Sequence, residues 1–198
     1  MLSRVSYSAR ARFKESSVET TSISLGFKAP YFDLPNTITG KNLKLSDLQI
    51  NQGLLVMFIC NHCPYVIHIM KELVNLANDY QSKGFTVVAI SSNNIVKYPQ
   101  DSPSKMKEVA EEYGFTFPYL YDESQDIAKA YDAVCTPDFS IFDSSLACVY
   151  RGQLDGSRPG SGVPVTGEDL RAVFDAILQE EPVNKSQTPS LGCSIKWK

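Results

Sequence analysis

Two of the five cysteines lie three positions apart, in the segment Cys60-Asn-His-Cys-Pro64. A C-x-x-C pair can exchange a disulfide with other thiols, or it can supply half of a zinc site. A structural zinc site needs four ligands, and the sequence has neither a second C-x-x-C nor an H-x-x-x-H. We therefore expect redox chemistry at Cys60 and Cys63, with no resident metal and no cofactor.

Pro64 indicates where this pair lies in the fold. Proline fits an α-helix only in its first turn, where its missing N–H would have no helical partner. Residues 53–59 form an apolar run typical of a buried strand, and apolar residues recur at helical spacing from 66 to 80. The pair thus falls at a helix N-terminus, where backbone N–H groups and the helix dipole stabilise a thiolate. We expect Cys60 to be the more exposed of the two sulfurs.

His62 stands between the two cysteines. An imidazolium at this position lowers the pKa of a neighbouring thiol and makes the disulfide more oxidising. We expect His62 to tune the pair in this way. A side chain that merely fills the loop is the alternative.

The rest of the chain alternates strand and helix patterns. We predict strands at residues 85–90 and 117–121, and helices at 103–113 and 125–134. A hairpin is expected where residues 140–143 and 147–151 flank Ser144-Ser145, followed by a last helix capped by Thr166. This order predicts a three-layer α/β fold.

Charge and length exclude several classes of protein. The 198 residues carry 19 Lys and Arg against 22 Asp and Glu, with the basic residues scattered. This balance gives no electrostatic footprint for nucleic acid or an anionic membrane surface. The longest apolar run, residues 54–59, is too short to cross a bilayer. We expect neither nucleic acid nor a membrane as a partner.

We divide the chain into a flexible N-terminal extension (1–22), one domain (23–181) and a C-terminal tail (182–198). The extension is rich in arginine and serine, as transit peptides are, so an organelle is the alternative to the expected cytoplasmic location. The tail holds Cys193 and the only tryptophan, Trp197, and we expect it to dock on the domain.

Several motifs together resemble a known family. The segment Gly26-Phe-Lys-Ala-Pro-Tyr-Phe-Asp-Leu34 resembles the opening of the alkyl hydroperoxide reductase/thiol-specific antioxidant (AhpC/TSA) family, and the C-x-x-C with the later Thr136-Pro137 resembles a thioredoxin fold. The segments CNHCPYV, CTPDF, YRGQLDGSRPG, PVTGEDLR and GCSIKW resemble a peroxiredoxin-like subgroup with a C-x-x-C active site. The resemblance implies a thioredoxin-like three-layer α/β fold, with a central mixed sheet flanked by helices.

The resemblance also implies roles for individual residues. Cys60 would attack the substrate, Cys63 would resolve the intermediate, and Pro137 would follow a cis peptide bond. Thr136 would present its backbone to an extended substrate, with Asn61 and Pro64 beside it at the substrate-binding side.

Four further residues are candidates for auxiliary roles. An arginine that assists the thiolate would be Arg151 or Arg158. Cys135, two positions before Pro137, is either a functional thiol or a buried residue. Cys193 is either a third redox thiol or a residue that packs the tail onto the domain.

The sequence departs from both parent patterns. The peroxiredoxin motif P-x-x-x-T-x-x-C would place the peroxidatic cysteine at Cys63, but Val56 and Cys60 replace its proline and threonine. Leu54 stands where thioredoxins carry a buried acid, six residues before the first cysteine. The sequence therefore offers no carboxylate at this position that could transfer a proton to or from the cysteines.

Three functions fit these residues. The first is a thiol–disulfide oxidoreductase with an antioxidant-type role, which acts on a protein or small-molecule disulfide and is served by an electron-donor thiol protein. The second is a thiol peroxidase whose sulfenic acid is resolved within the C-x-x-C or by Cys193. The third is a non-catalytic Cu(I) carrier that uses the two thiolates and His62.

Overall fold

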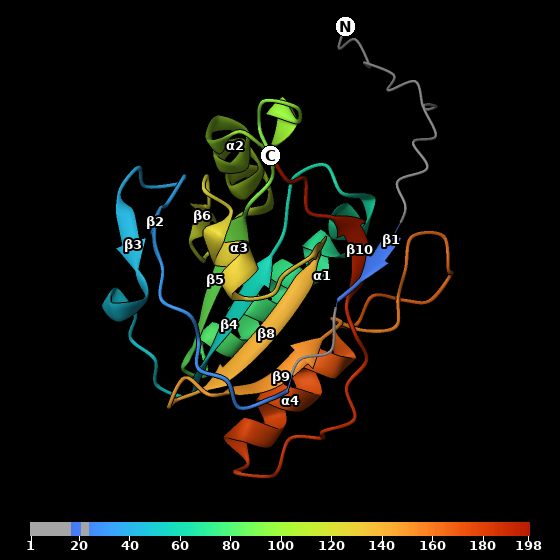
Figure 1. The fold of residues 1–198 in the computed structure, drawn as a ribbon. Helices are drawn as coiled ribbons and strands as arrows, with labels where there is room; N and C mark the ends of the chain where they lie inside the picture. The colour runs from blue at the N-terminus through green and yellow to red at the C-terminus, as the bar shows by residue number, and fades with distance from the viewer. Residues whose placement is uncertain (1–16, 21–23) are drawn as a thin grey trace, which may run out of the picture.

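The computed structural model describes residues 17–20 and 24–198. Its centre is a five-stranded mixed sheet in the order β6-β5-β4-β8-β9 (Figure 1). β4 pairs in parallel with β5, which pairs in parallel with β6, whereas β8 is antiparallel to both β4 and β9. The strands of this sheet are β4 (Gly53–Phe58), β5 (Phe85–Ser91), β6 (Tyr119–Tyr121), β8 (Asp138–Asp143) and β9 (Cys148–Gly152).

Helices cover both faces of the sheet, and two smaller sheets flank it. The helices are α1 (Pro64–Gln81), α2 (Pro103–Tyr113), α3 (Asp126–Ala130) and α4 (Glu168–Leu178), with short 3-10 turns η1 (Leu45–Asp47) and η2 (Pro99–Asp101). The smaller sheets are the hairpin β2 (Asp33–Pro35) with β3 (Asn42–Lys44), and the sheet β1 (Ser17–Glu19), β10 (Leu191–Ser194) and β7 (Cys135–Thr136). In the part of the chain that the structure describes, no helix is long and apolar enough to span a membrane.

β4 is buried along its whole length because both of its faces are packed. Leu55 and Met57 belong to the core shared with α1, α2 and α4. Leu54 and Val56 point to the opposite core, which includes Ala128 of α3. Two layers of helices around a mixed sheet confirm the predicted three-layer α/β fold, with α1 and α4 on one face and α3 on the other (Figure 1).

The helix predicted at residues 125–134 is wrong in its C-terminal half, since α3 ends at Ala130. Asp132 takes a φ of 53°, and the Ala133 N–H donates to the Ala128 carbonyl at 2.8 Å. This left-handed stop satisfies the last carbonyls of the helix. It releases the following residues into β7.

The predicted cap of the last helix is wrong by one residue, because Gly167 and not Thr166 is the N-cap of α4. The buried carboxylate of Asp155 accepts the N–H groups of Thr166 and Gly167 at 2.8 and 2.7 Å. Gly167 has a φ of 67°, which an L side chain rarely adopts. The loop that precedes α4 is therefore fixed by hydrogen bonds to the Asp155 carboxylate.

Part of the extension predicted to be flexible is a strand. Ser17–Glu19 forms β1 and pairs with β10, with Ser17 opposite Cys193. Residues 1–16 and 21–23 lie outside the described residues. The C-terminal tail is thus placed between β1 on one side and β7 on the other.

Phe174→Ala is expected to lower the free energy of unfolding by about 3–5 kcal/mol. Phe174 of α4 is fully buried and packs on Tyr80 of α1 and Phe85 of β5, with ring centroids 4.5 and 4.6 Å apart. Urea denaturation measures the change. The control is Ile67→Ala on the exposed side of α1, expected to stay within about 0.5 kcal/mol of the native protein. Equal losses in both variants would contradict this packing.

Candidate active site

The two cysteines lie where β4 passes into α1. Cys63 is the N-cap of α1, and Pro64 is its first residue. Both thiols are buried, with Cys60 1% and Cys63 0% exposed, so the predicted difference in exposure between the two sulfurs is negligible. The strand and the helix fix the two sulfurs from opposite ends, because both elements are packed into the same core.

Thr136 faces both sulfurs. Its hydroxyl lies 3.4 Å from Cys60 Sγ, and its carbonyl oxygen lies 3.2 Å from Cys63 Sγ, where a protonated thiol can donate to it. The Thr136–Pro137 peptide bond is cis. This short loop therefore positions the two thiols against one residue.

The negative charge of the pair belongs on Cys63. Hydrogen bonds from the thiols of Cys193 and Cys60 lower the pKa of Cys63 far below its ordinary value, and the backbone N–H of Val66 adds to this. Burial and the Thr136 carbonyl oppose the charge, but several donors outweigh one acceptor. The helix N-terminus thus stabilises a thiolate at its N-cap residue.

Cys60 is the protonated partner. Its hydrogen bond to Cys63 raises the pKa of the Cys60 thiol, and burial and the charge of Asp101 raise it further. Two buried sulfurs in contact share one proton, since ionising both would place two charges in the same apolar site. The pKa directions of the two thiols therefore place the charge of a singly ionised pair on Cys63 and the proton on Cys60.

Asp101 is a buried carboxylate at this site that the sequence analysis missed. It ends η2 and is fully buried. It accepts hydrogen bonds from the Asn61 N–H at 2.8 Å, from Asn93 Nδ2 at 2.9 Å and from His62 Nδ1 at 2.7 Å. A carboxylate thus stands beside the cysteines, although Leu54 occupies the position where the sequence led us to look for one.

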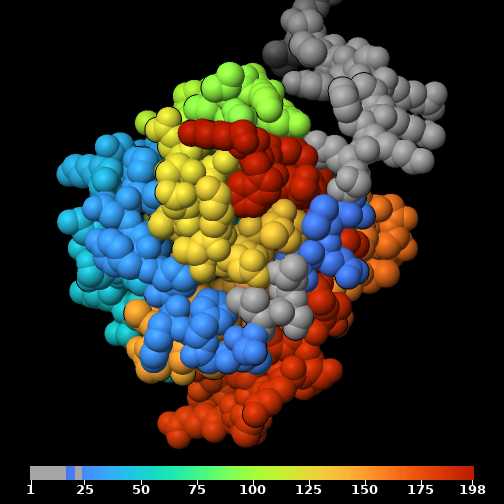
Figure 2. Space-filling model, viewed as in Figure 1, coloured from blue at the N-terminus to red at the C-terminus, as the bar shows by residue number. Residues whose placement is uncertain are grey.

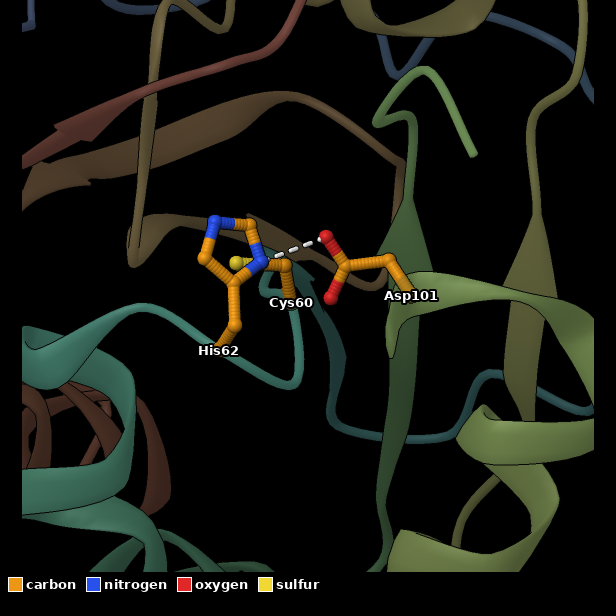
Figure 3. Close-up of side chains that lie close together, drawn as sticks. All are labelled: Cys60, His62 and Asp101. Carbon is orange, nitrogen blue, oxygen red and sulfur yellow. Dashed lines mark hydrogen bonds and ion pairs between the residues drawn. The ribbon is translucent and has the colours of Figure 1, made fainter. Parts of the chain in front are cut away.

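His62 is held on two sides. Its ring stacks on Tyr98 with centroids 5.3 Å apart, and Nδ1 pairs with Asp101 (Figure 3). Figure 3 shows the ring overlapping the Cys60 sulfur in this view, with the Asp101 carboxylate to its right at the end of the dashed line. The predicted tuning residue therefore reaches the thiols as a partner of Asp101.

One group in the described part of the chain has the spacing of a metal site. A ligand atom from each of Cys60, His62 and Asp101 lies within 4.8 Å of the other two. The set differs from the Cu(I) ligands considered above, because a carboxylate replaces the second thiolate. Oxygen is a poor ligand for Cu(I), so this cluster favours the copper carrier less than the sequence did.

Asn61 holds the loop through three contacts. Its N–H binds Asp101, its Nδ2 donates to the Gln100 carbonyl at 2.8 Å, and its Oδ1 accepts from the Tyr119 hydroxyl at 3.1 Å. These contacts make Asn61 a positioning residue in this structure. The substrate-binding role predicted for Asn61 and Pro64 stays a prediction.

Arg151 of β9 is engaged away from the C-x-x-C. It donates to the Tyr131 and Asp132 carbonyls and pairs with Asp138 at 3.3 Å. Burial raises the pKa of Asp138 to about 6, and the charge of Arg151 opposes that rise.

Arg158 lines a pocket beside Pro137. Its guanidinium donates to the Asp155 and Ser157 carbonyls at 2.7 Å and to Gln153. Tyr65, Leu191 and Pro159 are among the other residues around this pocket. Arg158, a candidate for assisting the thiolate, thus lines a pocket next to the C-x-x-C pair.

Cys135 and Cys148 are unreactive by their surroundings. Burial raises the pKa of each thiol to about 12. The Cys135 sulfur lies 3.4 Å from the Thr20 hydroxyl, and Cys148 packs in the core that contains Phe142. Both stay protonated near neutral pH.

The tail occupies the edge that the resemblance assigned to a substrate. β10 pairs antiparallel with β7, in a register that places Cys193 opposite Thr136. The role predicted for Thr136, which is to present its backbone to an extended substrate, stays a prediction, and in this structure β10 pairs along that residue. Figure 2 shows the C-terminal residues in red beside the yellow α3 region and close to β1 in blue.

Residues 25–153 match the AhpC/TSA family, and the chain belongs to that family. An uncharacterised conserved protein from Geobacillus kaustophilus is 59% identical and has a similar structure, with a TM-score of 0.90 over 92% of this chain and 96% of the other.

Two curated relatives represent the two redox classes. A Mycobacterium tuberculosis protein named "Putative peroxiredoxin" is 27% identical over 58% of this chain and 68% of its own. The thiol-disulfide oxidoreductase ResA of Geobacillus thermodenitrificans is 24% identical over 73% of this chain and 76% of its own. The fold of the chain is thioredoxin-like, and the names of these distant relatives support an oxidoreductase class.

Asp101→Asn is expected to move the pH midpoint of Cys60 alkylation to lower values. The carboxylate raises the pKa of Cys60 through its charge, and asparagine keeps the size while removing the charge. Iodoacetamide modification of Cys60 against pH, located by peptide mass spectrometry, measures the midpoint. Asp126→Asn, at an exposed carboxylate of α3, is the control with no shift expected. An unchanged or higher midpoint in Asp101→Asn argues against the interaction.

Proposed function

We propose that the protein is a thiol–disulfide oxidoreductase of the C-x-x-C type that cycles Cys60 and Cys63 between dithiol and disulfide. The observation that carries this proposal is geometric: the C-x-x-C pair lies at the N-terminus of α1 with both sulfurs against Thr136, 3.4 Å from its hydroxyl for Cys60 and 3.2 Å from its carbonyl oxygen for Cys63. Such a pair holds both a nucleophile and a resolving group in contact. An antioxidant-type role, with an electron-donor thiol protein to re-reduce the pair, belongs to the same proposal.

The first step is attack by Cys60 on a substrate disulfide. As the Cys60 sulfur bonds to one substrate sulfur, its proton passes to Cys63, whose protonated form can donate to the Thr136 carbonyl. The other substrate sulfur leaves as a thiolate. The product is a mixed disulfide between Cys60 and the substrate.

The second step is resolution by Cys63. Its proton goes to the departing thiolate, because the donors around Cys63 keep its pKa low. The Cys63 thiolate then attacks Cys60 Sγ, the Cys60–substrate bond breaks, and the second substrate thiolate leaves. The pair has lost two electrons, and the substrate disulfide has gained them.

Asp101 and His62 are positioning residues in this scheme. The hydrogen bond between them fixes the loop between the cysteines, and the carboxylate charge disfavours a second anion at Cys60 until the substrate arrives. The pair is thereby kept as a monoanion. This charge state suits exchange, because one sulfur leaves or attacks while the other holds the proton.

Cys63→Ser is expected to accumulate a mixed disulfide between Cys60 and glutathione when treated with oxidised glutathione. Loss of the resolving thiol stops the reaction after the first step. Intact-protein and peptide mass spectrometry identify the adduct and its site. The native protein is expected to release two glutathione thiols and form the Cys60–Cys63 disulfide, and Cys148→Ser serves as the matched control that behaves like it. A native protein that exchanges no disulfide overturns the function.

A second function, thiol peroxidase, is favoured by the location of the charge. Cys63 carries the thiolate and stands at the position that the peroxiredoxin motif gives to its peroxidatic cysteine. Attack on a hydroperoxide would give a Cys63 sulfenic acid and release water or an alcohol. A thiol, Cys60, replaces the threonine of that motif beside the reacting sulfur.

Stopped-flow oxidation by hydrogen peroxide separates the two functions. For an oxidoreductase without peroxidase activity, we expect the reduced pair to react no faster than free cysteine. A rate at least about a hundredfold above free cysteine, lost in Cys63→Ser and kept in Cys148→Ser, would establish the peroxidase, since a positioned thiolate is what accelerates such a reaction.

A further inference from the structure

Three sulfurs meet around one residue. Thr136 contacts Cys60 through its hydroxyl and Cys63 through its carbonyl, and Cys193 of β10 is its partner in the strand register. The Cys193 thiol is near enough to Cys63 to lower the pKa of the Cys63 thiol by donating to it. Because β10 also packs against α1, the tail brings its cysteine to the sulfur that holds the charge (Figure 1).

Gly192 lets the tail come this close. A Cβ at Gly192 would lie 2.0 Å from the Thr136 carbonyl oxygen and 3.1 Å from Pro137 Cδ. No side chain fits there unless β10 moves away. The contact between β10 and the Thr136–Pro137 loop is therefore a close backbone approach.

Hydrogen bonds hold the rest of the tail. The Ile195 N–H donates to the Val134 carbonyl at 2.9 Å, and the Lys196 N–H donates to Asn93 Oδ1 at 2.8 Å. Asn93 also donates to Asp101 at 2.9 Å, so one side chain bonds both the tail and the carboxylate beside Cys60. The tail is thus fixed immediately after Cys193.

The surroundings of Cys193 differ from those of an ordinary core cysteine. Cys148 is buried among hydrophobic side chains, and burial raises the pKa of its thiol to about 12. Cys135, the neighbour of Thr136, contacts the hydroxyl of Thr20. Of these three thiols, Cys193 is the one that lowers the pKa of Cys63, whereas the charge of Cys63 only raises the pKa of Cys135.

We propose that Cys193 is a third redox thiol, which takes over the disulfide from the C-x-x-C pair. The step rests on the proposed function, because it begins with the Cys60–Cys63 disulfide. The Cys193 sulfur attacks Cys63 Sγ, the Cys63–Cys193 bond forms and the Cys60–Cys63 bond breaks. Cys60 leaves as a thiolate and takes the proton that Cys193 gives up. One disulfide is exchanged for another, so no outside oxidant or reductant takes part.

This transfer changes what the active site presents. A Cys63–Cys193 disulfide ties β10 to the start of α1 and covers the Thr136 edge, while Cys60 is again a thiol. An extended disulfide substrate would need that edge, whereas a small disulfide needs only the Cys60 sulfur. The third thiol therefore favours small disulfides as substrates while the tail is docked.

Disulfide mapping after limited oxidation tests the transfer. The reduced protein is treated with oxidised glutathione, acidified and blocked with N-ethylmaleimide, then digested, and the linked peptides are identified by mass spectrometry. In the native protein we expect both the Cys60–Cys63 and the Cys63–Cys193 linkages. In Cys193→Ser, only the first should form. In Cys60→Ser, oxidised glutathione should give the second as the sole intramolecular linkage.

Two further variants keep the result interpretable. Cys148→Ser, which removes a thiol from the other core, should show the native pattern. Gly192→Ala, which retains all five thiols, should form Cys60–Cys63 normally and lose most of the Cys63–Cys193 linkage, because β10 must move from Thr136.

The outcomes distinguish the two proposals. If Cys60–Cys63 forms but Cys63–Cys193 is absent from both the native protein and Cys60→Ser, the third thiol is refuted and the proposed function stands. If neither linkage forms and no cysteine carries a glutathione adduct, the protein does not react with the disulfide, and the proposed function itself fails.

Discussion

The candidate active site depends on the hydrogen bonds that stabilise a negative charge on Cys63. A charge in an apolar core is costly unless hydrogen bonds replace the water it has lost. Here the replacements are the thiols of Cys60 and Cys193 and the backbone N–H groups of Val66 and Cys193. They come from three separate parts of the chain. The helix N-terminus, the C-x-x-C loop and the tail must therefore all be in place for this charge to be stable.

The same constraint explains why the acid beside the cysteines comes from η2. A carboxylate close to Cys60 raises the pKa of that thiol, which helps confine the charge to Cys63. What matters physically is where the carboxylate ends up, not which strand carries it. Asp101 is fixed by Asn61, Asn93 and His62, so its position is as well determined as that of a side chain on β4.

The sequence predicts the local part of this arrangement and misses the long-range part. The strand, the C-x-x-C and the proline-initiated helix follow from neighbouring residues, because burial pattern and proline geometry act over a few positions. Asp101 lies about 40 positions from the cysteines in a loop, and no periodicity reports where a loop folds. β1 and the Gly192 contact were missed for the same reason, since each depends on a partner more than 50 positions away. The helix α3 ends early because Asp132 adopts a positive φ. An aspartate predicts a positive φ much less strongly than a glycine does, so the sequence did not indicate this end.

The five cysteines are divided by their surroundings and not by their spacing. Burial is the largest cause that raises the pKa of Cys135 and of Cys148 to about 12, so both thiols stay protonated near neutral pH. Cys60, Cys63 and Cys193 are equally buried, but each has another sulfur as a hydrogen-bond partner. A thiol in such a contact can transfer its proton to a neighbouring sulfur instead of to water. Burial therefore does not prevent it from forming a thiolate. Disulfide exchange among these three cysteines therefore needs only one sulfur to be accessible to the substrate. The other two can stay buried.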